Sequence, residues 1–261
     1  MSHFCVAVAT KTGKESEISK ILEPYWEELE VAPYIYRTKK QMIIEGKETQ
    51  KQVKEQYEKK DESWKNDEWV QKVLNAKTDE DFYLLERDEE CYSYDEEGNE
   101  FTTYNPNSKW DWYVVGGRFR DALPIKEGEH VVKVNVAKIK DIHFDLAGED
   151  KEYLKRFWEI IVEGDEPRNE KEAKMVEENI WKPQHYIDIY ETKENYIKTN
   201  STFYPWAFVN ETRWYERGKM GWWAMSDATS ESIKDFTNFF DEYVNSPEHQ
   251  DEYLTIVDCH I

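Results

Sequence analysis

Two histidines and an aspartate near the chain ends are the residues best suited to chemistry. His3 adjoins an apolar run at residues 4–9, and Asp258 and His260 lie in another at residues 253–261. Both runs predict strands. Because residues two apart on a strand share a face, Asp258 and His260 point together, and His3 joins them if the two strands pair.

This set of side chains has two chemical interpretations. Two histidines and a carboxylate can bind a divalent metal, and a His–Asp pair can orient an imidazole for acid–base work. His3, Asp258 and His260 are therefore the candidate catalytic residues and the candidate metal ligands. The simpler alternative is that the terminal histidines only satisfy backbone groups at a sheet edge.

A second candidate site lies in the aromatic segment at residues 105–121. Gly116 and Gly117 let the backbone approach a ligand closely, Arg118 offers a planar fork for phosphate or carboxylate, and Asp111 can orient that fork. Tryptophan rings can stack on bases and other flat ligands. With the Gly/Trp segment at residues 217–225, the predicted ligand-binding residues are Trp110, Asp111, Trp112, Gly116, Gly117, Arg118, Trp222 and Trp223. The alternatives are a buried Asp–Arg pair and a tryptophan core.

Motifs of several common enzyme classes are missing from the sequence. It has no GxSxG elbow, no CxxC pair and no HExxH, and the acidic run at residues 88–100 lacks EF-hand spacing. Three widely spaced cysteines exclude a complete disulfide framework and favour a reducing cytoplasm. We find no apolar run of about 18 residues and no secretion signal, so we expect a cytoplasmic protein with no membrane partner.

The composition combines a strong acidic charge with many aromatic rings. The 261 residues have a formal net charge of −21, with 35% charged and 15% aromatic residues. This charge argues against direct binding to a nucleic-acid backbone, which requires basic patches. It fits a solvated acidic surface over an aromatic core, and it also fits a decoy that imitates the charge of DNA.

The order of elements predicts how these residues are positioned. Strands at both ends, with helices between them, predict one α+β domain over residues 1–261. Its single mixed or antiparallel sheet contains the N- and C-terminal strands. Residues 46–90 and 146–182 are expected to form acidic helical insertions. We also expect a hairpin at 88–100, a helix at 230–244, and either a strand or the end of a helix at 182–196.

Several islands of sequence resemble an uncharacterised family of proteins found in bacteriophages and in their bacterial hosts. They are Ser-His-Phe at residues 2–4, Leu-x-Pro-aromatic-x-Glu at 22–27, Trp-Asp-Trp-Tyr-x-x-Gly-Gly-Arg-aromatic at 110–119, Trp-x-x-x-Gly-x-Met-Gly-Trp-Trp at 214–223, and Thr-x-Val-Asp-Cys-His-Ile at 255–261. The resemblance implies a phage-type accessory protein in the host cytoplasm. Members often carry histidine where this chain has Tyr215, so a catalytic histidine is not implied there.

Three functions follow as hypotheses. The first is an accessory protein that binds a small nucleotide-like or anionic aromatic ligand, with sequestration of a host immune signal as its biological form. The second is a metal-dependent phosphoesterase or nuclease that uses His3, Asp258 and His260. The third is an acidic inhibitor that binds a host protein by imitating nucleic acid.

Overall fold

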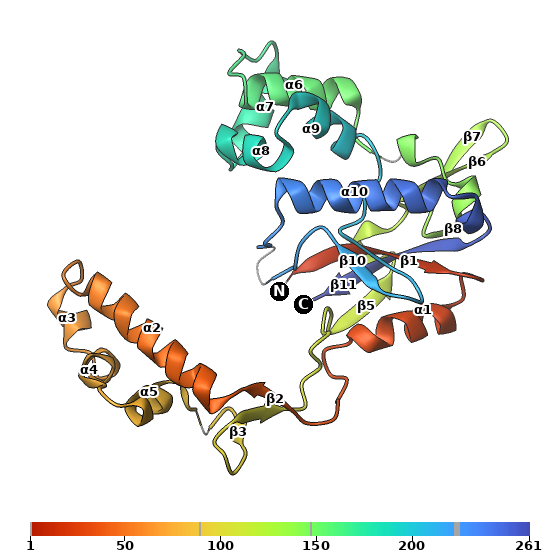
Figure 1. Ribbon diagram of the computed structural model, residues 1–261. Helices are drawn as coiled ribbons and strands as arrows, with labels where there is room; N and C mark the ends of the chain where they lie inside the picture. The colour runs from red at the N-terminus through yellow and green to blue at the C-terminus, as the bar shows by residue number, and fades with distance from the viewer. Residues whose placement is uncertain (1, 89, 147, 222–224) are drawn as a thin grey trace. The chain divides into compact units, whose positions relative to one another are not determined.

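A computed structural model describes residues 2–88, 90–146, 148–221 and 225–261. The chain forms two compact units, one of them inserted into the other (Figure 1). The larger unit contains Met1–Leu29 and Pro106–Ile261, and the smaller contains Glu30–Asn105. The inserted unit is therefore wider than the predicted segment 46–90.

Both ends of the chain lie in the central sheet of the larger unit. Strands β1 (His3–Thr10) and β11 (Tyr253–His260) are antiparallel, with His3 opposite His260 and Thr10 opposite Tyr253. The sheet is mixed because β1 also pairs in parallel with β9 (Ala207–Val209). The outer strands are β9 (Ala207–Val209), β10 (Trp214–Glu216), β5 (Trp112–Val115) and β8 (Val136–Lys138). The predicted α+β class and the terminal strands in one sheet are confirmed.

Each face of this sheet carries its own hydrophobic core, as the two-residue period of a strand requires. Helix α10 (Ser230–Asn245) covers one face and α1 (Glu15–Leu22) covers the opposite face (Figure 1). Under α10 lie the buried side chains of Cys5, Ala7, Ala9, Leu254 and Ile256. Against α1 lie those of Phe4, Val6, Val8, Val257 and Cys259. His3, Asp258 and His260 continue the face under α10.

Helix α10 confirms the helix predicted at residues 230–244. Thr229 caps its first turn, because its hydroxyl accepts the backbone N–H of Ser232 in a capping box. Its buried residues recur at helical spacing and include Ile233, Phe236, Phe240, Tyr243 and Val244. The apolar face therefore lies on the sheet.

Residues 151–200 of the larger unit are helical over a longer span than the predicted 146–182. The helices are α6 (Lys151–Ile161), α7 (Glu170–Glu178), α8 (Pro183–Tyr190) and α9 (Lys193–Asn200). Buried Tyr196 contacts the rings of Phe157, Trp158, Tyr186 and Tyr190. This aromatic packing explains why the ambiguous segment at 182–196 is helical. The same unit also has a hairpin of β6 (Leu123–Glu127) and β7 (His130–Val134).

The smaller unit joins four helices to a short sheet. The helices are α2 (Lys39–Tyr57), α3 (Glu62–Lys65), α4 (Glu68–Asn75) and α5 (Asp79–Glu86). The sheet strands are β2 (Tyr34–Arg37), β3 (Ser93–Tyr94) and β4 (Glu100–Thr102), and the pairing of β3 with β4 confirms the predicted hairpin. Fully buried Glu100 accepts hydrogen bonds from Arg37 Nε at 2.8 Å and Nη2 at 2.6 Å.

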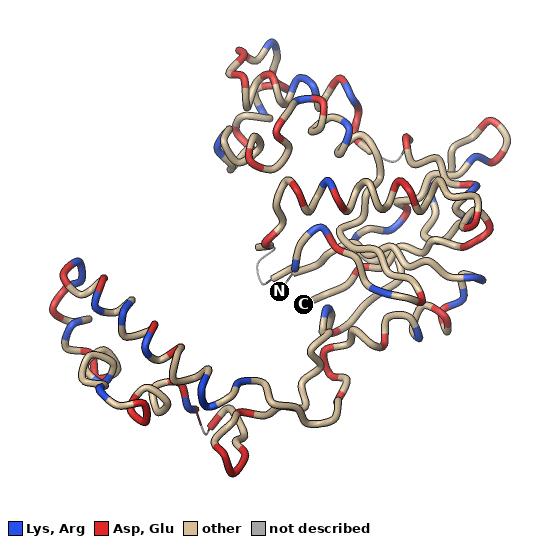
Figure 2. Tube along the Cα trace, in the orientation of Figure 1, with Lys and Arg blue, Asp and Glu red and all other residues tan. Residues whose placement is uncertain are grey.

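Charged residues lie mainly on helices and turns (Figure 2). Strand β1 has none, and β11 has only Asp258. A carboxylate in a buried strand needs a partner because burial without one is costly. No helix among the described residues is both long and apolar enough to cross a membrane.

The three cysteines should differ sharply in reactivity. Burial raises the pKa of Cys5 to about 12 and that of Cys259 well above its usual value, whereas Cys91 is exposed. A hydrogen bond to Asp88 also raises the pKa of Cys91. Since the thiolate is the nucleophile, iodoacetamide should alkylate only Cys91 in the native protein at pH 8. Mass spectrometry should find no adduct on native Cys91→Ser and three adducts on the denatured wild type; a native adduct on Cys5 or Cys259 would contradict this burial.

Candidate active site

Two histidines lie side by side where the central strands end, and each contacts its own carboxylate. His3 Nδ1 is 2.9 Å from Oδ1 of Asp258. His260 Nδ1 is 2.8 and 2.9 Å from the two carboxylate oxygens of Asp111. The two imidazole centroids are 5.0 Å apart, and the ring planes meet at 77°. The strand register produces this pair, because His3 and His260 are direct partners of β1 and β11.

Each carboxylate also determines which ring nitrogen remains available. An ionised carboxylate only accepts hydrogen bonds, so Nδ1 of each histidine must be the donor. In a neutral imidazole the lone pair then lies on Nε2. Asp258 and His260 are buried, with 2% and 4% of their surface exposed, so solvent competes little for these contacts. Both imidazoles therefore have Nδ1 engaged by a carboxylate.

The Gly-Gly turn holds the second oxygen of Asp258. Gly116 and Gly117 have φ angles of +75° and +51°, and the turn they open brings the backbone N–H of Arg118 to 2.9 Å from Asp258 Oδ2. A Cβ on Gly117 would lie 2.4 Å from Cβ of Asp258. The two glycines thus let the backbone come close to the Asp258 side chain.

The two tryptophans that flank Asp111 differ in environment. Trp112 is 42% exposed, and its ring stacks on His260 with centroids 4.9 Å apart and planes at 17°. Trp110 is buried, donates from Nε1 to the Leu22 carbonyl oxygen at 3.1 Å, and stacks on Trp26. Trp112 can therefore contact a ligand, whereas Trp110 belongs largely to the core.

An open hollow of about 400 Å³ shares Asp111 and Trp112 with the site. It is lined by Ser19, Glu23, Trp26, Trp110, Asp111, Trp112 and Tyr113. None of these lining residues is basic. The hollow therefore suits a flat, uncharged group better than a phosphate.

The position of Asp111 in the sequence predicts that it orients Arg118, and this prediction is wrong. Its carboxylate contacts His260, and the exposed Arg118 side chain forms no ion pair with any described residue. Arg118 is thus a cation next to the site, tied to it through its backbone. Sequence reasoning missed the Asp111–His260 contact; its one signal was a carboxylate directly before an apolar strand. Predicted Trp222 and Trp223 lie outside the described residues.

The proposed metal ligands are close together but are engaged with different partners. His3 contacts Asp258, whereas His260 contacts Asp111. Within the described ranges, no three His, Cys, Asp or Glu side chains are grouped as metal ligands. The geometry that is present is that of two adjacent imidazole–carboxylate pairs.

The chain matches no family model, no curated protein and no solved structure.

Proposed function

We propose that this site is a general acid–base centre that cleaves a phosphoester bond in a nucleotide-like ligand. The observation that carries the proposal is the pair of imidazoles 5.0 Å apart, each with Nδ1 on its own carboxylate. Phosphoester cleavage requires a base for the attacking hydroxyl and an acid for the leaving oxygen. Histidine serves in either role because it changes charge near neutral pH.

The proton transfers follow from this arrangement. Nε2 of the neutral imidazole takes the proton of the attacking water as its oxygen bonds to phosphorus. Nε2 of the protonated imidazole gives its proton to the leaving oxygen as the P–O bond breaks. Asp111 and Asp258 hold the rings in the required tautomer and stabilise the imidazolium form, as carboxylates do for histidine bases.

Recognition of the ligand is divided between neighbouring groups. The exposed ring of Trp112 stacks on the base, and the guanidinium of Arg118, which forms no ion pair with a described residue, holds the phosphate. The acidic hollow beside Trp112 accepts the uncharged aromatic part of the ligand.

The test is turnover of a defined panel in the presence of EDTA. The panel contains nucleoside monophosphates, cyclic mononucleotides and cyclic dinucleotides. Chromatography and ³¹P NMR detect the cleavage products. We expect cleavage of at least one compound, and Trp112→Leu should raise KM about 5- to 150-fold because a stacked base is worth about 1–3 kcal/mol. Trp181→Leu is the matched control, since Trp181 is also exposed and stacked on a histidine, His185.

Other outcomes favour the other hypotheses. Binding without turnover would reject catalysis and favour sequestration of the ligand. Activity lost in EDTA and restored by Mn²⁺ would favour the metal-dependent phosphoesterase. If no member of the panel bound or reacted, cleavage and sequestration of a nucleotide-like ligand would both be rejected. The acidic inhibitor would then remain.

A further inference from the structure

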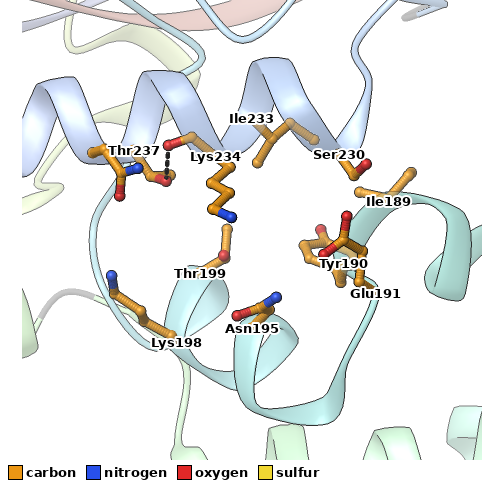
Figure 3. A pocket seen from close by; sticks show the side chains of 11 residues that line it. Ile189, Tyr190, Glu191, Asn195, Lys198, Thr199, Ser230, Ile233, Lys234 and Thr237 are labelled. Carbon is orange, nitrogen blue, oxygen red and sulfur yellow. Dashed lines mark hydrogen bonds between the residues drawn. The ribbon is translucent and has the colours of Figure 1, made fainter.

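A small cavity separates the N-terminal half of α10 from the α8–α9 helices (Figure 3). Its volume is about 140 Å³. Typical pockets for drug-sized ligands have about 300–1,000 Å³, so this cavity admits one small group. It lies outside the His–Asp site, with which it shares no lining residue.

Two lysines enter this space from opposite sides. Lys234 extends from α10 toward α9, and Lys198 extends from α9 toward α10 (Figure 3). Lys234 has no ion pair with a described residue. Among the described residues, Lys198 has one loose ion-pair contact, with Asp241 at 3.6 Å, and 63% of its side chain is exposed.

The remaining polar groups of the cavity suit an anion. Asn195 and Thr199 from α9 and Ser230 from α10 offer neutral donors (Figure 3). The Thr237 hydroxyl already donates to the Lys234 carbonyl oxygen at 3.0 Å. Glu191 is the one acidic lining residue, and it lies on the side of Ile189 and Tyr190, away from Lys198.

We propose that this cavity binds a tetrahedral oxyanion, either free phosphate or the phosphoryl end of a larger molecule. Lys198 and Lys234 supply the charge, and an anion between them relieves their mutual repulsion. Asn195, Thr199 and Ser230 supply hydrogen bonds to its oxygens. The bound anion links α9 to α10, and α10 covers the sheet face that carries the two histidines.

The test is calorimetric titration of the full-length protein with sodium phosphate, sodium sulfate and AMP, supported by thermal unfolding. We expect phosphate to bind and to raise Tm with concentration. Lys234→Gln and Lys198→Gln should each weaken binding about tenfold or more, because each removes a charged hydrogen bond. Lys174→Gln removes an equal charge from an exposed position on α7, and Arg118→Gln reports on the His–Asp site; neither should change the cavity's affinity.

Each outcome decides the proposal. It fails if phosphate and sulfate do not bind at millimolar concentrations. It also fails if the double lysine variant, still folded by circular dichroism, binds them as the wild type does. Binding lost in Arg118→Gln but kept in both lysine variants would assign the anion to the catalytic site instead. AMP bound with the affinity of phosphate indicates a phosphoryl end as the ligand; phosphate and sulfate bound without AMP indicate the free ion.

Discussion

Gly117→Ala is expected to lower the free energy of unfolding by about 2–5 kcal/mol and to abolish the Asp258 contact with Arg118 N–H. Two costs combine. The φ angle of +51° strains any residue with a Cβ, and that Cβ would lie 2.4 Å from Cβ and 2.5 Å from Oδ2 of Asp258. Because Asp258 lies in the central strand β11, it has little room to move. Urea unfolding followed by tryptophan fluorescence measures the change.

Gly128→Ala separates the two costs. Gly128 has a similar φ of +64°, but an added Cβ would meet nothing within 4 Å. The control should therefore lose only about 1–2 kcal/mol, from backbone strain alone. Equal losses in the two variants would show that Gly117 has no tight approach to Asp258.

The sequence predicts best what local pattern determines. Residues 4–9 and 253–261 have the pattern of buried strands, and the two-residue period alone predicts Asp258 and His260 on one face. Helix α10 is equally predictable from the sequence, since its apolar residues recur at helical spacing after Thr229. Placing His3 beside Asp258 and His260 requires one further assumption, that the terminal strands pair. The register of β1 and β11 confirms this assumption.

Contacts that depend on distant register could not be read from the sequence. Trp110 and Trp112 are the same residue type two positions apart, which suggests a shared environment. In the structure β5 begins only at Trp112, and Trp110 precedes it, in a bridge to Trp26. Asp111 contacts His260 because β5 pairs with β11 in one register, with Trp112 opposite His260. No local signal encodes that pairing.

The boundaries of the inserted unit illustrate a different failure. Composition marks the charged helices, but the unit also includes β2, whose residues pair with β4 more than sixty positions later. Strand β2 has an apolar sequence like that of the larger unit, so composition alone does not assign it to the inserted unit. Arg37 and Glu100 form their partly buried contact through this pairing.

The largest effect on rate is expected from the two histidines. His3→Gln and His260→Gln should each lower kcat about 10²- to 10⁴-fold, because each removes one proton-transfer group while leaving Trp112 and Arg118 to bind the ligand. KM should change much less than kcat. The rate of each variant should also lose one limb of its dependence on pH, since only one acid–base group would remain.

His249→Gln provides a matched control for this prediction. His249 also contacts a carboxylate through Nδ1, with Glu252 Oε1 at 3.1 Å, and it stacks on Tyr243. It lies beyond the opposite end of β11, because Glu252 directly precedes Tyr253. A general loss of stability would affect all three variants, whereas the proposed chemistry affects only His3 and His260. If His249→Gln lost as much activity as the other two, or if both of them kept a bell-shaped pH profile, the two imidazoles would not be the acid and the base.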